Sequence, residues 1–286
     1  MTRFRLPPTL SFTLSLVAGF PILALAAPDS DRDALTLPDG QRCLVIGREE
    51  GPPQPLLFLF QGGIESALAE PLYTEVARLL APAGVLSVVL DAPAHGADAT
   101  PGEPPELSGW AYRVAHGKPF LDPFLARVSA ALDHFIAVGW ADPQRIAACG
   151  TSRGGFLAFH VAAHDLRIRA VAGIAPVTDL AALREFSSLN PPPDASGLAL
   201  ATLGPRLAGR PVWLCIGNSD TRVDTDRAIA FARAVVAASR ALPSPPSPIP
   251  VDLLVQSTPG HRSFAADHRR LSTWLRPHLG LPVGPE

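Results

Sequence analysis

The stretch from Ile146 to Leu157 reads Ile-Ala-Ala-Cys-Gly-Thr-Ser-Arg-Gly-Gly-Phe-Leu, and it constrains the fold of this chain more than any other. A short apolar run leads into a glycine, Ser152 follows between two glycines, and an apolar helical pattern begins directly after it. The Gly-x-Ser-x-Gly spacing is typical of a sharp turn from a strand into a helix that holds the serine exposed. Glycines suit this turn because a side chain at either flank would collide with the neighbouring elements. The stretch therefore predicts a reactive serine at the end of a buried strand.

Strands and helices alternate along the rest of the chain. Apolar runs predict strands, and apolar residues three and four apart predict helices. The predicted strands are 41–47, 55–60, 85–90, 145–149, 169–174, 211–217 and 251–256, the first at a sheet edge. The predicted helices are 70–80, 123–138 with Asp122 as its cap, 153–164, 198–207, 224–240 and 264–275. This alternation favours an α/β fold with a largely parallel sheet and helices on both faces. We expect one domain over residues 41–280, preceded by a lead-in at 27–40.

Residues 97–121 interrupt the alternation. They are rich in proline, glycine and glutamate and lack a strong hydrophobic period, so we expect a long loop with one helical turn near Trp110 and Tyr112. Long loops in compact domains are usually functional or disordered. Whether this loop acts as a lid is left open by the sequence.

The first 26 residues have the features of a secretory signal peptide. Arg3 and Arg5 form a basic start, an apolar run follows over residues 10–25, and Ala24-Leu25-Ala26 offers a cleavage site. We expect a secreted or periplasmic protein with no stable membrane insertion after cleavage. The alternative is an uncleaved N-terminal membrane anchor.

Composition narrows the partners. The chain is 47% hydrophobic and has a formal net charge of −2, so a sizeable core is possible and no basic excess suggests nucleic-acid binding. Its three cysteines, Cys43, Cys149 and Cys215, all lie in or beside predicted strands. Although export would permit disulfides, this placement favours buried free thiols that behave as small hydrophobes.

The residues that could carry chemistry all follow predicted strands. They are Gly62 and Gly63, Asp91, Ser152, Asp220 and His261. In an open parallel sheet, functional groups gather at the carboxyl ends of the strands. The order serine, aspartate, histidine along the chain is also one of the known orders of a catalytic triad.

Three motifs carry a resemblance to a known family. Gly150-Thr-Ser-Arg-Gly154, Gly217-Asn-Ser-Asp-Thr-Arg-Val223 and Gly260-His-Arg-Ser-Phe264 resemble the α/β-hydrolase superfamily, and the chain is similar to it from about residue 40 onward. The second and third motifs are most similar to its dienelactone-hydrolase and prolyl-oligopeptidase-like branches. The resemblance implies a serine hydrolase of esters or peptides.

Each member of the proposed triad has a chemical role. Ser152 is the expected nucleophile, and His261 is the expected base because imidazole titrates near neutrality. An aspartate would hold the imidazole in the right tautomer. Asp220 is favoured by its family position, and Asp224 is the alternative, although a helix start beside it suggests a capping role.

The other histidines have weaker claims. His160 and His164 have the spacing of a zinc-binding pair, but Val161 stands where a metalloprotease of that type needs a glutamate. We expect surface or packing roles for them and a solvent-facing position for His268. No metal or organic cofactor is expected.

The remaining site residues follow from family position. The oxyanion hole is expected from the backbone amide of Arg153 and one amide of the turn after residue 60, with Gly63 favoured over Gly62. His95, Trp110 and Tyr112 are candidates for the substrate pocket. The Arg153 side chain is expected either to pair with a surface acid or to favour anionic substrates.

The sequence therefore favours hydrolysis of small carboxylic esters through an acyl-serine intermediate. The first alternative is a prolyl-oligopeptidase-like serine peptidase with a peptide substrate, although those relatives usually carry a large N-terminal domain. The second is a non-catalytic binding protein on the same fold.

Overall fold

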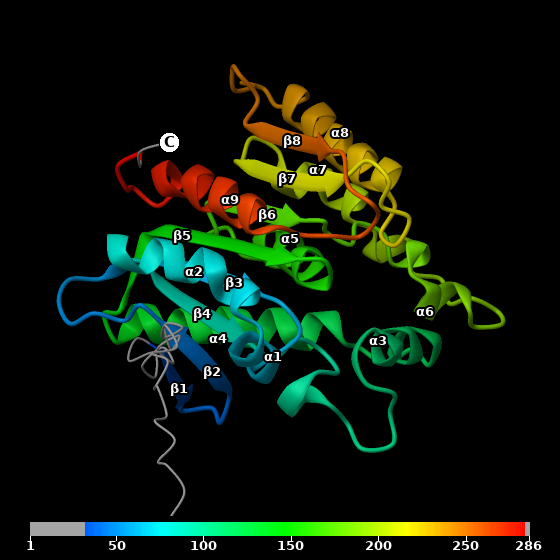
Figure 1. Ribbon diagram of the computed structural model, residues 1–286, viewed down its shortest axis with the longest axis horizontal. Coiled ribbons are helices and arrows are strands. Elements are labelled where there is room, and N and C mark those ends of the chain that lie inside the picture. The colour runs from blue at the N-terminus through cyan, green and yellow to red at the C-terminus, as the bar shows by residue number, and fades with distance from the viewer. Residues whose placement is uncertain (1–31, 284–286) are drawn as a thin grey trace, which may run out of the picture. The chain divides into compact units, whose positions relative to one another are not determined.

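The computed structural model of the protein describes residues 32–283, and the predicted signal peptide lies outside the described residues. Its centre is an eight-stranded sheet in the order β1-β2-β4-β3-β5-β6-β7-β8 (Figure 1). The pairs β1–β2 and β2–β4 are antiparallel, and all other neighbouring pairs are parallel. The expected α/β class with a mostly parallel sheet is confirmed.

The elements follow the predicted alternation closely. The strands are β1 (Arg32–Thr36), β2 (Arg42–Ile46), β3 (Gln54–Phe60), β4 (Leu86–Leu90), β5 (Ala141–Thr151), β6 (Ala170–Ile174), β7 (Val212–Gly217) and β8 (Val251–Gln256). The α-helices are α1 (Ile64–Ala69), α2 (Glu75–Leu80), α3 (Glu106–Ala115), α4 (Leu121–Ala137), α5 (Arg153–His164), α6 (Arg184–Ser187), α7 (Gly204–Leu207), α8 (Thr225–Arg240) and α9 (Ala265–His278). Short 3₁₀ turns join several of them.

Helices cover both faces of the sheet, because the central strands are apolar on both sides. One face packs against α4, α5 and α8 through a set of buried phenylalanines: Phe124, Phe135, Phe156, Phe159 and Phe231. The other face packs against α1, α2 and α9, and α2 and α9 run side by side across it (Figure 1). Burial on both faces explains why β3 and β4 are continuous apolar runs in the sequence.

Two expectations about where elements begin or lie are wrong. The sheet begins within the predicted lead-in, at β1, so the segment 41–47 contains the second strand of the sheet and not an edge strand. The sequence Arg-Asp-Ala-Leu-Thr hides β1 because Asp33, Ala34 and Thr36 are exposed and the strand therefore lacks an apolar run. The helix α4 also begins one residue before Asp122, with Phe120 at the cap position, because Leu121 is buried against the core.

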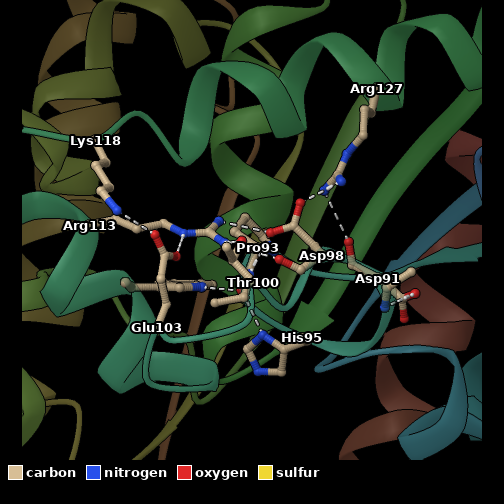
Figure 2. Close-up of polar contacts among 12 residues, drawn as sticks. Asp91, Pro93, His95, Asp98, Thr100, Glu103, Arg113, Lys118 and Arg127 are labelled. Carbon is tan, nitrogen blue, oxygen red and sulfur yellow. Dashed lines mark hydrogen bonds and ion pairs between the residues drawn. The ribbon is translucent and has the colours of Figure 1, made fainter.

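The segment 97–121 is more ordered than predicted. It contains α3, a helix of ten residues, where the sequence predicts a loop with a single turn. Figure 2 shows its main anchor, the side chain of Arg113, which is 8% exposed. The Arg113 guanidinium donates to Glu103 and to Asp98, each at 2.8 Å, and to the hydroxyl of Thr100 at 3.2 Å. Burial of these paired charges ties α3 to the loop that precedes it.

The cysteines and the lengths of the helices complete the description of the fold. The three cysteines are free and buried, as predicted, and burial raises the pKa of Cys43 and of Cys215 to about 12. Among residues 32–283, no helix has the length and apolar character needed to cross a membrane.

Candidate active site

Ser152 lies on the turn between β5 and α5, where the sequence places it. Its backbone has φ 53° and ψ −117°, an unfavourable conformation for a residue with a side chain. Hydrogen bonds hold this conformation: the Ser152 amide donates to the Ile174 carbonyl at 2.9 Å, and the Val177 amide donates to the Ser152 carbonyl at 3.0 Å. The strain is stored at a residue whose hydroxyl is presented at the end of the sheet, as at many functional sites.

The glycines around Ser152 are required by close backbone contacts. A Cβ atom at Gly154 would overlap the carbonyl oxygen of Phe60 on β3, and one at Gly150 would overlap the backbone of Gly154. The tight turn therefore depends on both glycines of the motif, because α5 approaches β3 without room for a side chain.

A continuous chain of hydrogen bonds joins Asp220, His261 and Ser152. The Nδ1 atom of His261 lies 2.7 Å from Asp220 Oδ2, and its Nε2 atom lies 3.0 Å from Ser152 Oγ. With the neutral imidazole protonated at Nδ1, the ring donates to the carboxylate and accepts from the hydroxyl. This geometry allows a proton to pass from the Ser152 hydroxyl to His261.

The carboxylate of Asp220 is buried and held in its charged form. Burial opposes ionisation, but hydrogen bonds from His261 and from the backbone amides of Val223 and Arg222 outweigh it and keep the pKa of Asp220 below its usual value. By contrast, Asp224 accepts from the amides of Asp226 and Arg227 at the start of α8. Asp224 is thus a helix cap, as its sequence context suggests.

The two glycine amides of the turn after β3 differ in their hydrogen bonds. Gly63 is buried and lies directly before α1, and its amide donates to the hydroxyl of Ser66 at 2.9 Å. Gly62 is half-buried, and among the described residues its amide has no hydrogen-bond acceptor. Of the two glycines of this turn, Gly62 is therefore the one whose amide is left free among the described residues.

A cleft of about 420 Å³ surrounds Ser152 and His261. Its walls come from the turns after several strands, and three arginines are among them. The lining residues are Gln61, Glu70, Leu72, Tyr73, Leu107, Thr151, Ser152, Arg153, Ala175, Arg222, His261, Arg262 and Ser263. Of these, Leu107 and Tyr73 carried no signal in the sequence, whereas Arg222 lies within the motif that contains Asp220.

The three predicted pocket residues lie in different places, and none of them lines the Ser152 cleft. Trp110 is fully buried, donates to the Pro93 carbonyl at 2.6 Å and stacks on Phe120, so it anchors α3 in the core. Tyr112 lines a separate hollow that does not contain Ser152. The sequence pointed to these aromatic side chains, but it could not show which face of α3 each occupies.

The third predicted residue, His95, is not among the residues that line the cleft, but it contacts Arg153, the residue after Ser152. Its Nδ1 atom is 2.7 Å from the Pro93 carbonyl, and its Nε2 atom is 2.6 Å from a guanidinium nitrogen of Arg153. The same nitrogen donates to Glu106 at 2.6 Å. Burial, opposed by the Pro93 hydrogen bond and assisted by the Arg153 charge, keeps the pKa of His95 below its usual value. The Arg153 side chain is thus paired with an acid, one of the two expected outcomes, and no pattern in the sequence indicated that this acid would be Glu106.

The remaining histidines do not form a metal site. His160 is buried and donates from Nε2 to the Leu198 carbonyl at 3.0 Å, whereas His164 is exposed. No cluster of three metal-ligating side chains occurs within residues 32–283. The expectation that His268 faces solvent is wrong: it is 1% exposed because it shares the buried face of α9 with Leu271 and Leu275.

The buried His160 predicts how stability depends on pH. Burial lowers its pKa to about 4, against about 6.5 in the unfolded chain. The unfolded state therefore binds a proton on His160 more readily than the folded state does. The free energy of unfolding is thus highest above pH 6.5 and decreases by up to about 3 kcal/mol as the pH falls towards 4. Urea unfolding at pH 7 and pH 4.5 should show this loss, and His160→Gln should reduce it. His164→Gln is the matched control on the same helix; an equal pH dependence in wild type and His160→Gln would contradict the assignment.

The order of the sheet and the serine on the turn after β5 define the class of protein. The chain is a serine hydrolase of the α/β-hydrolase superfamily. The sequence profile of the prolyl oligopeptidase family matches residues 125–280, more than half of the chain, and the chain belongs to this family. No curated protein sequence matches it.

Solved structures share the fold at low sequence identity. The Thermus thermophilus protein TT1662 superposes with a TM-score of 0.60 at 24% identity, over 87% of this chain and 97% of its own. A cold-adapted esterase from an Arctic intertidal metagenomic library gives a TM-score of 0.54 at 20% identity, over 84% of this chain and 92% of its own. A puromycin-hydrolysing peptidase of Mycobacterium tuberculosis gives 0.62 at 18% identity, over 87% of this chain but 39% of its own.

Proposed function

We propose that this protein hydrolyses carboxylic esters through an acyl-serine intermediate, with Ser152 as nucleophile, His261 as general base and acid, and Asp220 as the group that orients His261. The hydrogen-bonded chain Asp220–His261–Ser152 is the observation that carries the proposal. A serine hydroxyl is a weak nucleophile at neutral pH, and a positioned imidazole supplies the activation that it needs.

The proposed reaction has two halves. His261 Nε2 takes the proton of Ser152 as Oγ bonds to the ester carbonyl carbon, and the imidazolium then gives that proton to the departing alcohol oxygen as the C–O bond breaks. Water attacks the acyl-serine in the second half, with its proton passing to His261, and the carboxylic acid leaves as Ser152 regains its hydrogen. Throughout, the Asp220 carboxylate accepts from Nδ1 and stabilises the imidazolium.

Backbone amides are proposed to hold the oxyanion. The Arg153 amide begins α5, and the uncommitted amide of Gly62 follows β3, the strand beside β5. Donors fixed in this way stabilise charge that develops only in the transition state, and each contributes about 10²- to 10³-fold in rate. The contacts of the Arg153 side chain with His95 and Glu106 would keep the first of these amides in place.

A neighbour with esterase activity supports the ester assignment. The cold-adapted esterase from the Arctic library shares the fold over 84% of this chain and 92% of its own. Membership of the prolyl oligopeptidase family favours one second candidate, a serine peptidase. Both activities would use the same three residues, so substrate preference separates them.

A substrate panel tests the choice. We expect the protein without residues 1–26 to hydrolyse p-nitrophenyl esters with a kcat/KM at least about 100-fold above that for aminoacyl p-nitroanilides, because amides need stronger protonation of the leaving group. Release of p-nitrophenol and p-nitroaniline is followed by absorbance. Anilide cleavage without an ester preference would support the peptidase, and turnover of neither class would support the binding protein.

A further inference from the structure

The helix α3 presents two faces with different roles. The face that contains Trp110 and Arg113 is buried and fixed by the contacts with Pro93, Asp98 and Glu103 (Figure 2). A lysine reinforces this anchor, because Lys118 donates to the second oxygen of Glu103 at 2.8 Å. Since the anchored side chains are buried and paired, we expect α3 to be a fixed wall and not a mobile lid.

The opposite face of α3 lines a hollow of about 840 Å³. Ser108, Ala111, Tyr112 and Ala115 recur at the spacing of one helix face, and three of them have small side chains that leave the hollow open. The other wall is formed by α6 and the segment 189–194, which contains three consecutive prolines. Its lining is mostly apolar, and its volume falls in the range of about 300–1,000 Å³ that is typical of ligand pockets.

This hollow adjoins the Ser152 cleft. The first turn of α3 contributes Leu107 to the cleft and Ser108 to the hollow. A second link crosses the wall between them, because Arg222 of the cleft donates to Glu185 of the hollow at 2.7 Å. Two neighbouring pairs of lining residues, Leu107 with Ser108 and Arg222 with Glu185, thus place the hollow beside the cleft that contains Ser152.

The charged groups beside the hollow have partners, apart from Oε2 of Glu185, which is buried without a hydrogen-bond partner among the described residues. Glu185 is shared between Arg222 and Arg184, the latter at 3.6 Å, and the Asp194 carboxylate accepts from the Ser196 amide at 2.9 Å. Paired charges offer little to a further ion, whereas the proline, alanine and tyrosine side chains offer apolar surface. The chemistry of the lining favours an uncharged alkyl or aryl group.

We propose that this hollow, referred to as the α3 pocket, binds the larger uncharged substituent of the ester, an alkyl or aryl group, while the carbonyl reacts at Ser152. The inference rests on the proposed ester hydrolysis and adds the class of substrate. A substituent buried there contributes binding energy remote from the reacting carbon, which can be used to position that carbon. The enzyme would therefore prefer esters with one bulky apolar side to short esters.

Filling the α3 pocket tests this inference. Ser108→Trp places a large side chain in the α3 pocket at the end nearest the cleft. Ala115→Trp places one at the far end and serves as the second variant if Ser108→Trp folds poorly. Both positions are exposed, so a bulky side chain is tolerated there. Ala137→Trp is the matched control, an exposed alanine of α4 that lines neither the pocket nor the cleft. The readout is the ratio of kcat/KM for a bulky ester to that for p-nitrophenyl acetate. Two bulky esters are compared, p-nitrophenyl 4-phenylbutanoate and 4-phenylbutyl acetate, so that either side of the ester can reveal the effect.

We expect wild type to favour at least one bulky ester, and Ser108→Trp to lower that ratio by at least about tenfold, the loss of about 1.4 kcal/mol of apolar contact. Ala137→Trp should keep the ratio. If the ratio for each bulky ester is equal in wild type, Ser108→Trp and Ala137→Trp, the inference is overturned, whereas the proposed ester hydrolysis is unaffected.

A binding measurement separates the two proposals. Calorimetry with the neutral product 4-phenylbutan-1-ol should show binding to Ser152→Ala protein and at least about tenfold weaker binding once Ser108→Trp is added. If wild type hydrolyses no ester but Ser108→Trp still weakens binding of the alcohol, the proposed function is wrong and the α3 pocket is nevertheless a ligand site. If neither ester ratio nor binding responds to the tryptophan, the α3 pocket is not a ligand site.

Discussion

Replacing Ser152 with alanine is expected to reduce kcat for p-nitrophenyl esters by about 10⁶-fold, the size of effect seen when the nucleophile of a triad is removed. The hydroxyl lies 3.0 Å from His261 Nε2 and is the group from which the proton would be taken. Alanine has the same backbone preference against φ 53° as serine, so the turn should keep its shape. Steady-state assays with the purified variant, together with its circular dichroism spectrum, provide the measurement.

Ser263→Ala is the matched control for this prediction. Ser263 also lines the cleft, and among the described residues its hydroxyl has no hydrogen bond to another side chain. The same loss of one hydroxyl should leave kcat within about twofold, because the Ser263 hydroxyl makes no hydrogen bond to a group that could take its proton. Undiminished ester turnover in Ser152→Ala, or an equal loss in both variants, would contradict the assignment of the nucleophile.

Replacing Asp220 with asparagine is expected to lower kcat by about 10⁴-fold. Asp220 accepts the Nδ1 hydrogen of His261 at 2.7 Å, and an amide nitrogen at that position would favour the wrong tautomer, in which Nε2 carries the hydrogen and cannot accept from Ser152. Because the Asp220 carboxylate is kept charged by its hydrogen bonds, the loss should persist across the neutral pH range. The measurement is kcat against pH for wild type and variant.

The identical substitution at Asp224 is the control. Asp224 caps α8 through one carboxylate oxygen, and asparagine caps helices about as well as aspartate. Asp224→Asn should therefore change kcat by less than about threefold, with only the half-exposed ion pair to Arg227 lost. A large loss in Asp224→Asn and none in Asp220→Asn would transfer the orienting role to Asp224.

Much of the fold could be predicted because the central strands are buried on both faces. Continuous apolar runs such as Leu56–Phe60 have few alternatives to a covered strand. Gly139 marks the end of a helix by its positive φ, and Gly217 marks the end of a strand because a Cβ atom there would overlap the side chain of Thr258. The edge strand β1 lacked this signal because only part of it is covered. Its assignment depends on pairing with β2, which is a contact between segments and not a local pattern.

The helix α3 was missed for a comparable reason. It contains Gly109 and follows Pro104 and Pro105, and these residue types are typical of loops. In the structure a Cβ atom at Gly109 would overlap the Pro104 carbonyl oxygen and the side chain of Ala94, so this glycine permits close packing. The helix is fixed by the buried side chains of Trp110 and Arg113, whose partners lie up to 17 residues away.

The candidate site was predictable in its principal residues and not in its surroundings. Ser152, Asp220 and His261 follow strands β5, β7 and β8, and parallel strands bring their carboxyl ends to one edge. The pairing of Arg153 with Glu106 and the use of the Gly63 amide by Ser66 depend on how two loops pack, and no residue pattern encodes that. The positions of the three triad residues can therefore be predicted from the order of the strands, whereas the lining of the cleft requires the structure.

The most direct test of the central claim is covalent labelling of the nucleophile. The protein is incubated with a fluorophosphonate, digested and analysed by peptide mass spectrometry. The proposed mechanism predicts a single adduct on Ser152, formed more slowly by at least about 10³-fold in His261→Ala, because the hydroxyl then lacks its base. A protein that is not labelled, or is labelled at another residue and equally well without His261, would contradict it.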